Sequence, residues 1–331
     1  MSTAAELGYR VVDNWERLPE GTSHKDVPDV AVDSRDRVYV LTRMDAQVLV
    51  YDRDGTFLGS WGEGSFSDRP HGITIGPDDT VYIVDEGRHA VEAYTTEGRR
   101  IAVIGPSGSA SDTGADAEIP DIFDKIGSIQ RPAGPYNKPT KLAVAPNGDF
   151  YVTDGYGNAR VHHFDAEGRL LSSWGEPGSG PGQFHLPHSV VVADDGRVLV
   201  ADRENDRIQL FSAAGDYLEE WNDFHRVAGL FIRDQMLYVA ELAWRSGYRT
   251  WRNGAVSSPL CGRVSVLDLR GNFLVRLDDS DLSAVAGFTA PHGLCADSRG
   301  DIYVAEVTWT DGGKSGLYAA SHSLLKLTRT D

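Results

Sequence analysis

Three histidines in this 331-residue sequence share one local motif and one register. Each follows a proline, precedes glycine or serine, and lies fourteen residues before an acidic residue that ends an apolar stretch. The histidines are His71, His188 and His292, and the acidic residues are Asp85, Asp202 and Glu306. Neutral imidazoles are common zinc ligands, and three of them leave a fourth position open for water or substrate. The motif therefore predicts a tris-His site for one divalent metal ion, preferably zinc.

A second polar set follows the position of these acidic residues. Arg43, Glu86 and Arg203 each come one residue after that position in their own repeat, and Tyr156 comes two residues after Asp154. Arginine offers a rigid fork of donors that suits a carboxylate. A tyrosine beside a divalent cation loses its proton more readily and can act as a base. We expect these side chains to face the histidines, although each arginine could instead pair only with a neighbouring acid.

Six copies of one repeat carry these residues. Each copy has two apolar strands around a turn rich in Asp and Gly and a third short strand, and the first five copies have a fourth. The first two strands read VAVDSRDRVYVLT, HGITIGPDDTVYIVDE, KLAVAPNGDFYVTDGY, HSVVVADDGRVLVADR, GLFIRDQMLYVAE and HGLCADSRGDIYVAE. Short strands and turns at this period are typical of four-stranded blades, so the sequence predicts an all-β, six-bladed β-propeller of the NHL-repeat type. We expect residues 1–331 to form this single domain.

The sixth repeat lacks a fourth strand. The N-terminal stretch GYRVVDNWERL resembles the missing strand, so we predict that it completes the last blade and closes the ring. Closure of this kind removes an exposed sheet edge.

The predicted blades explain the spacing of the histidines. The three histidines begin the innermost strand of blades two, four and six, where the odd-numbered blades carry Pro28, Thr140 and roughly Val227. A Pro-His pair alone could be ordinary repeat sequence. Alternate blades, however, are related by a pseudo-threefold axis, so all three imidazoles are predicted to converge at one mouth of the channel.

Three segments are longer than the repeat requires. They are residues 105–137, 243–262 and 308–320. All three connect strands at the same face of a propeller, so they are predicted to wall a pocket over the channel.

Charge and composition exclude several classes of partner. The chain has 49 acidic and 32 basic residues and a formal net charge of −17, which disfavours nucleic acid and anionic membranes. The N-terminal stretch has no apolar signal region, no stretch approaches the roughly 20 apolar residues of a membrane span, and two cysteines are too few for a disulfide framework. We therefore expect a cytoplasmic protein that acts on a small molecule.

Taken together, these residues resemble the peptidyl-α-hydroxyglycine α-amidating lyase family. The segments VTDGYGNARVHHFD and WGEPGSGPGQFHLPHSVVVADDGRVLVADRENDRIQLF resemble the family's sequence around its catalytic tyrosine, second zinc histidine and catalytic arginine. RPHGI, APHGL and VYVLTR resemble its other histidine motifs and its first arginine. The resemblance implies zinc at the three histidines, catalytic roles for Tyr156, Arg43 and Arg203, and cleavage of a carboxylated carbinolamide to an amide and glyoxylate.

Two departures from the family bear on this interpretation. The family binds a structural calcium through backbone carbonyls matching Val30 and Ile73 and an aspartate after the third histidine, where this chain has Gly293, which counts against calcium. Glu86 adds a carboxylate that could repel a carboxylated substrate or recognise a cationic part of it. The substrate could accordingly be a different small carbinolamide or hemiaminal.

Two other functional classes stay open at this stage. A non-enzymatic NHL-repeat propeller would bind a protein or RNA partner, and it predicts no convergent polar register. A calcium-dependent, lactonase-like propeller hydrolase would place acidic and amide ligands in the channel, where this sequence has histidines.

Overall fold

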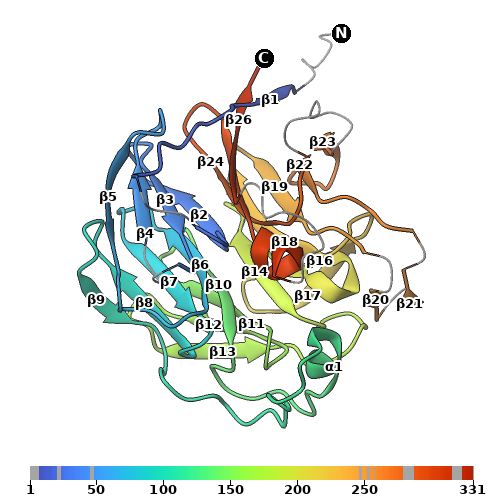
Figure 1. The fold of residues 1–331 in the computed structure, drawn as a ribbon. Coiled ribbons are helices and arrows are strands. Elements are labelled where there is room, and N and C mark those ends of the chain that lie inside the picture. The colour runs from blue at the N-terminus through green and yellow to red at the C-terminus, as the bar shows by residue number, and fades with distance from the viewer. Residues whose placement is uncertain are drawn as a thin grey trace.

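The computed structural model describes residues 7–20, 24–44, 48–245, 248–251, 254–256, 258–278, 287–314 and 323–330. It contains six four-stranded antiparallel sheets (Figure 1). The innermost strand of each sheet contacts the innermost strand of the next, and the sixth contacts the first. The protein is therefore a six-bladed β-propeller, as the repeats predict.

The strands follow the chain from the channel outward in each blade. Blade one contains β2 (Asp29–Val32), β3 (Val38–Leu41), β4 (Val48–Tyr51) and β5 (Phe57–Trp61), and blade two contains β6 (Pro70–Ile75), β7 (Val81–Asp85), β8 (Ala90–Tyr94) and β9 (Arg100–Val103). Blade three contains β10 (Pro139–Val144), β11 (Phe150–Asp154), β12 (Arg160–Phe164) and β13 (Leu170–Trp174), and blade four contains β14 (Pro187–Val192), β15 (Val198–Asp202), β16 (Arg207–Phe211) and β17 (Tyr217–Trp221). Blade five contains β18 (Val227–Arg233), β19 (Met236–Glu241), β22 (Arg263–Asp268) and β23 (Phe273–Leu277), and blade six contains β24 (Pro291–Ala296), β25 (Ile302–Glu306), β26 (Leu324–Arg329) and β1 (Tyr9–Val11).

The N-terminal strand closes the ring. β1 pairs antiparallel with β26, with Tyr9 opposite Arg329 and Val11 opposite Leu327, and the two strands lie side by side in Figure 1. The predicted closure is confirmed, although the paired strand is only three residues long. Because β1 covers the edge of β26, the last blade has the same four strands as the others.

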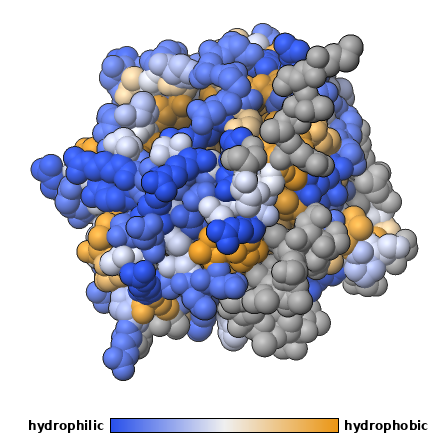
Figure 2. Space-filling view, turned by 90° about the horizontal axis from the view of Figure 1, so that it is seen from above, coloured by the Kyte–Doolittle hydropathy of each residue, from blue (hydrophilic) through white to orange (hydrophobic). Residues whose placement is uncertain are grey.

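The apolar core lies between neighbouring blades. The β-branched and aromatic residues of the inner strands pack across each blade interface, as in the cluster of Tyr39, Ile73 and Ile83 between blades one and two. The outermost strands are more exposed, and Leu58 and Leu171 are each about half accessible. On the face shown in Figure 2, hydrophilic residues predominate and the apolar areas are small and separate.

The acidic residues of the register have a structural role. Each is buried and accepts a backbone N–H from the segment that leads into the innermost strand of its own blade. Asp85 accepts from Ser67 at 2.8 Å, and Asp202 accepts from His185 at 2.8 Å. These carboxylates therefore fix the entry of the strand that carries each histidine.

The three long segments contain the remaining regular structure. Residues 105–137 include α1 (Ile122–Gly127), residues 243–262 include the short strands β20 (Arg249–Thr250) and β21 (Gly254–Ala255), and a π-helical turn spans Trp309–Gly313. Residues 315–320 of the third segment lie outside the described residues. None of the helices in the described part of the chain has the length and apolar character that a membrane span requires.

Candidate metal centre and substrate pocket

The three predicted histidines meet at the centre of the propeller. Their ring centroids are 4.6 to 4.9 Å apart, and one nitrogen of each lies within 4.8 Å of the others. His71, His188 and His292 are 2–4% exposed. Each lies in a local register shift at the start of β6, β14 or β24. Such bulges redirect a side chain, which here turns the imidazole toward the channel axis.

One nitrogen of each imidazole is held by the neighbouring blade. The Nδ1 atoms of His71, His188 and His292 lie 2.8, 2.7 and 2.7 Å from the backbone oxygens of Thr140, Ala228 and Pro28. A carbonyl oxygen only accepts, so each Nδ1 carries the hydrogen and each Nε2 keeps a free lone pair. These three acceptors are the backbone oxygens of the residues at the histidine position of the odd-numbered blades, so each odd-numbered blade orients the histidine of a neighbouring blade.

This arrangement fits a metal ion such as zinc. Metal-binding histidines commonly donate their second ring N–H to a backbone carbonyl or carboxylate, which fixes the tautomer. Burial lowers the pKa of all three imidazoles well below the ordinary value, and Arg43 or Arg203 lowers it further. The imidazoles are therefore neutral near pH 7, as metal ligands must be. This is the one such cluster among the residues that the structure describes.

Tyr156 lies beside the imidazoles. Its hydroxyl oxygen is 3.2 Å from Nε2 of His71, 3.1 Å from Nε2 of His188 and 3.1 Å from Nη1 of Arg203. The guanidinium can only donate, so the phenol oxygen accepts from Arg203 and gives its own hydrogen to an imidazole. A ligand set, an acid–base group and a fixed positive charge thus meet at one oxygen atom.

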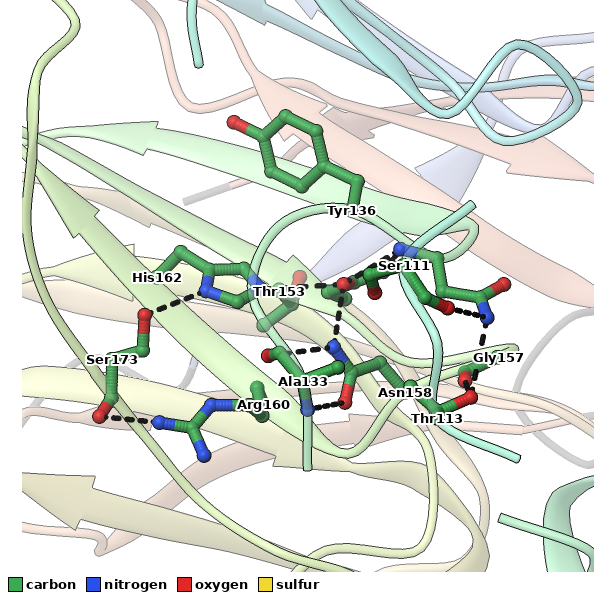
Figure 3. Close-up of polar contacts among 12 residues, drawn as sticks. Ser111, Thr113, Ala133, Tyr136, Thr153, Gly157, Asn158, Arg160, His162 and Ser173 are labelled. Atoms are coloured by element: carbon green, nitrogen blue, oxygen red, sulfur yellow. Dashed lines mark hydrogen bonds and ion pairs between the residues drawn. The ribbon is translucent and has the colours of Figure 1, made fainter. Parts of the chain in front are cut away.

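The loop that carries Tyr156 is fixed by the first long segment. Thr113 donates to the backbone oxygen of Gly157 at 2.6 Å, and Asn158 bonds both backbone groups of Ala133 (Figure 3). The buried carboxylate of Asp154 accepts from the side chain of Asn158 at 3.0 Å. The phenol ring also packs against Ile126 and Ile129. Contacts on both sides of the loop therefore hold the phenol in place.

Both predicted arginines are partly or fully buried and paired. Arg203 begins the 3-10 turn η1 (Arg203–Asn205), and its Nε donates to Glu204 at 2.7 Å. Arg43 lies 3.4 Å from Asp26. The predicted pairing with neighbouring acids occurs, yet both arginines still line the central pocket. Glu86 also lines it but pairs with Arg69 at 3.1 Å and Lys138 at 3.8 Å, and not with Arg43.

The pocket above the imidazoles has a volume of about 480 Å³. All three long segments contribute to its wall, through Ile122, Tyr248 and Thr310 for example. Its basic lining residues are Arg43, Arg69, Lys125, Lys138, Arg203 and Arg226, whereas its acidic ones are Glu86 and Asp311. The pKa of Lys125 is lowered, first by burial and then by Lys138. A strongly acidic protein thus has a locally positive pocket over its histidines.

Four of these basic residues lie outside the two repeat positions that hold the histidines and Arg43, Glu86 and Arg203. Arg69, Lys125, Lys138 and Arg226 come from loops before the innermost strands or from α1. Arg226 is buried and lies 3.2 Å from Glu204, so Glu204 forms ion pairs with both Arg203 and Arg226. In blade five, Ala228 and not Val227 occupies the histidine position, because the hairpin of β18 and β19 is one residue shorter than those of blades two, four and six: Val227 pairs with Glu241, whereas Pro70 pairs with Asp85.

The residues matching the family's calcium site do not fit calcium. The backbone oxygen of Ile73 accepts a hydrogen bond from the ammonium of Lys141 at 2.8 Å. Gly293 supplies no carboxylate, and a Cβ at this position would lie 2.2 Å from the carboxylate of Asp29. An ion pair between Lys141 and Asp29 therefore occupies this part of the channel.

Comparisons with known proteins agree with the fold and the motifs. The NHL repeat model matches residues 68–94, 136–164 and 184–211, which include His71, Tyr156, His188 and Arg203. NHL repeat-containing protein 3 of Homo sapiens is 32% identical over 321 residues, covering 90% of this chain and 81% of the human protein. Peptidyl-alpha-hydroxyglycine alpha-amidating lyase 1 of Drosophila melanogaster is 29% identical over 263 residues, covering 75% of this chain and 44% of the fly protein.

A solved streptogramin B lyase has the same fold. The superposition covers 98% of this chain and 98% of the lyase chain, with a TM-score of 0.59 and 10% sequence identity. At this identity the similarity supports the propeller fold alone. The human relative, the repeat matches and the similarity to the amidating lyases point to one group of propellers. The chain belongs to the NHL-repeat family, in the group similar to the peptidyl-α-hydroxyglycine α-amidating lyases.

Proposed function

We propose that the protein is a zinc-dependent carbon–nitrogen lyase. Its substrate is a carboxylated carbinolamide of the type R–CO–NH–CH(OH)–COO⁻, and its products are an amide and an aldehyde such as glyoxylate. The position of the Tyr156 oxygen carries the proposal, because it lies within 3.2 Å of two imidazoles and of Arg203. An acid–base group at that point can reach a hydroxyl presented to the metal centre.

His71, His188 and His292 would hold the metal through their Nε2 atoms. Zinc, when bound, supplies a Lewis acid that makes a coordinated hydroxyl more acidic. With the Nε2 atoms engaged, the hydroxyl of Tyr156 loses both imidazole acceptors, and the substrate hydroxyl becomes its partner. The Nδ1 bonds to Thr140, Ala228 and Pro28 keep the three rings in place throughout.

The chain's own residues then move one proton. Tyr156 acts in this step as a phenolate, its own proton having passed to solvent before the step. It accepts the proton of the substrate hydroxyl, and the electron pair left on that oxygen forms the aldehyde C=O bond. The carbon–nitrogen bond breaks, and the amide nitrogen takes the proton back from Tyr156. No external oxidant or water is consumed, so the step is an elimination and the products contain all atoms of the substrate.

The positive pocket suits the substrate carboxylate. Arg203 shares Glu204 with Arg226, and Arg69 shares Glu86 with Lys138, so each of these groups has one more positive than negative charge. Close, partly desolvated charges act much more strongly than the distant acidic surface, because salt screens beyond about 8 Å. We propose that Arg203 binds the carboxylate near Tyr156 and that Arg43 supports it from the opposite blade.

The direct test is release of glyoxylate from an N-acyl-α-hydroxyglycine by the zinc-reconstituted protein. The proposal expects equal amounts of glyoxylate and amide, with turnover lost on chelation and restored by zinc. A lactone substrate tests the hydrolase alternative in the same sample. If no N-acyl-α-hydroxyglycine is cleaved above the buffer rate while one zinc ion is bound, the lyase proposal is wrong.

A further inference from the structure

A second charged group lies on the channel axis next to the histidines. Asp29 follows Pro28, and Lys141 follows Thr140, the two residues whose carbonyls accept from His292 and His71. The ammonium of Lys141 contacts the Asp29 carboxylate directly and donates to the backbone oxygen of Ile73 at 2.8 Å. These two side chains come from blades one and three and meet beside Ile73 of blade two, which lies between them.

The carboxylate of Asp29 is otherwise satisfied by backbone donors. Its oxygens accept from the N–H groups of Val30 at 3.0 Å and Ile73 at 2.9 Å. The side chains of Asp29 and Lys141 are only 5% and 15% exposed. The pair is therefore a buried ion pair with hydrogen bonds on both partners, which is the condition under which such a pair is tolerated.

The surrounding backbone is shaped to admit this pair. A Cβ at Gly293 would lie 2.2 Å from Oδ1 of Asp29 and 2.8 Å from the backbone oxygen of Pro28. A carboxylate side chain at position 293 would therefore clash with Asp29 in its present position. The small space between the imidazoles and Lys141 has a volume of about 10 Å³. This is at the lower limit for a single water, so a hydrated ion has no room there.

We infer that the ammonium of Lys141 serves as the second axial cation of the channel, so that the propeller takes one metal ion and needs no calcium. A divalent ion at this level would meet an ammonium already bound to the carboxylate and the carbonyl that could ligate it. The ammonium of Lys141 neutralises the Asp29 carboxylate and bonds the Ile73 carbonyl, which a bound cation would otherwise do. This inference concerns the scaffold and does not depend on the lyase activity.

The same geometry predicts a gained calcium site. Without Lys141, the Asp29 carboxylate and the Ile73 carbonyl remain as unneutralised oxygen atoms, the ligand type that calcium prefers. Truncation to alanine also vacates the volume of the long side chain. Lys141→Ala is therefore expected to bind calcium, whereas the wild type is not.

The experiment uses zinc-loaded full-length protein in buffer freed of calcium, with thermal unfolding and calcium titration as readouts. The wild type should show no change in Tm on adding millimolar calcium and no stoichiometric calcium by elemental analysis. Lys141→Ala should have a Tm several degrees lower without calcium, recover part of that loss with calcium and bind about one calcium ion per chain. The double variant Asp29→Asn, Lys141→Met lacks both charges, so it should bind no calcium and its Tm should not change on calcium addition.

Two results would overturn the inference. One is a calcium ion retained by the wild type together with a rise in its Tm on calcium addition. The other is a folded Lys141→Ala protein that neither binds calcium nor changes in Tm. If Lys141→Ala folds only with calcium present and the double variant folds without it, the inference is supported, because the unpaired Asp29 is then the cause.

Discussion

Replacing Tyr156 by phenylalanine removes one oxygen atom from the centre of the site and little else. The ring keeps its packing against Ile126 and Ile129 and its place beneath the Arg203 guanidinium, 5.4 Å from the ring centroid. The lost oxygen is the atom that lies 3.1 to 3.2 Å from His71, His188 and Arg203. A positioned acid–base group typically contributes about 10²- to 10⁴-fold, so kcat of Tyr156→Phe should fall by that factor.

The effect on stability should be much smaller than the effect on rate. The variant leaves one donor of Arg203 without its partner, and an unsatisfied buried donor costs about 1–3 kcal/mol. The zinc ligands are unchanged, so the metal content should equal that of the wild type. KM should change little if Tyr156 acts mainly in the transition state, because lost transition-state interactions lower kcat and kcat/KM together.

Tyr136 provides a matched control. It is a fully buried residue of the same long segment, and its hydroxyl donates to the backbone oxygen of Ile104 at 3.0 Å, away from the three clustered imidazoles. Tyr136→Phe should lose some stability and keep kcat. The assay is steady-state glyoxylate release with zinc measured on the same samples. Wild-type kcat in a zinc-loaded Tyr156→Phe protein would refute the role given to this phenol.

Three further predictions concern the charges of the pocket. Arg203→Lys keeps the positive charge but lacks the planar group that contacts both Glu204 and Tyr156. Its kcat/KM should fall about 10- to 100-fold, which corresponds to the roughly 1.5–3 kcal/mol of a hydrogen bond to a charged group. An unchanged kcat/KM would exclude Arg203 from the reaction. Glu86→Gln removes the carboxylate that pairs with Arg69 and Lys138, so both become available to the substrate. KM for a carboxylated substrate should fall about three- to tenfold, which corresponds to roughly 0.7–1.4 kcal/mol of binding free energy. A raised KM would show that Glu86 recognises a cation instead. Raising ionic strength should increase KM for the anionic substrate more than for a neutral carbinolamide, and equal slopes would count against a positive pocket.

The fold and the histidines could be predicted because both follow a repeat. A propeller places the same repeat position at the same height in every blade, so the fourteen-residue spacing was enough to bring His71, His188 and His292 together. The same logic placed Arg43, Glu86 and Arg203 around one pocket. Closure by the N-terminal strand followed from the single missing strand in blade six.

The pocket residues that were not predicted lie in a long segment outside the repeat or at a third repeat position. Lys125 belongs to α1, in a segment outside the repeat. Arg69, Lys138 and Arg226 share one repeat position, two residues before the histidine position, so comparison of that position between blades could have found them. The carbonyl acceptors of the histidines are backbone atoms, which residue types do not reveal. Lys141 and Asp29 do share a register position, one residue after the histidine position, and comparison of that position between blades could have found their pairing.

The metal content of the purified protein tests the central claim most directly. After reconstitution with zinc and removal of the excess, the wild type should retain about one zinc ion per chain. Loss of a group that only hydrogen-bonds a metal ligand typically lowers metal affinity by roughly 10- to 100-fold. His188→Ala removes a ligand itself, so its zinc affinity should fall by more than that. His163→Ala, which alters a histidine stacked on Tyr151 away from the channel, should retain zinc. A wild type that holds no zinc, or a His188→Ala protein that keeps a full complement, would contradict the tris-His centre.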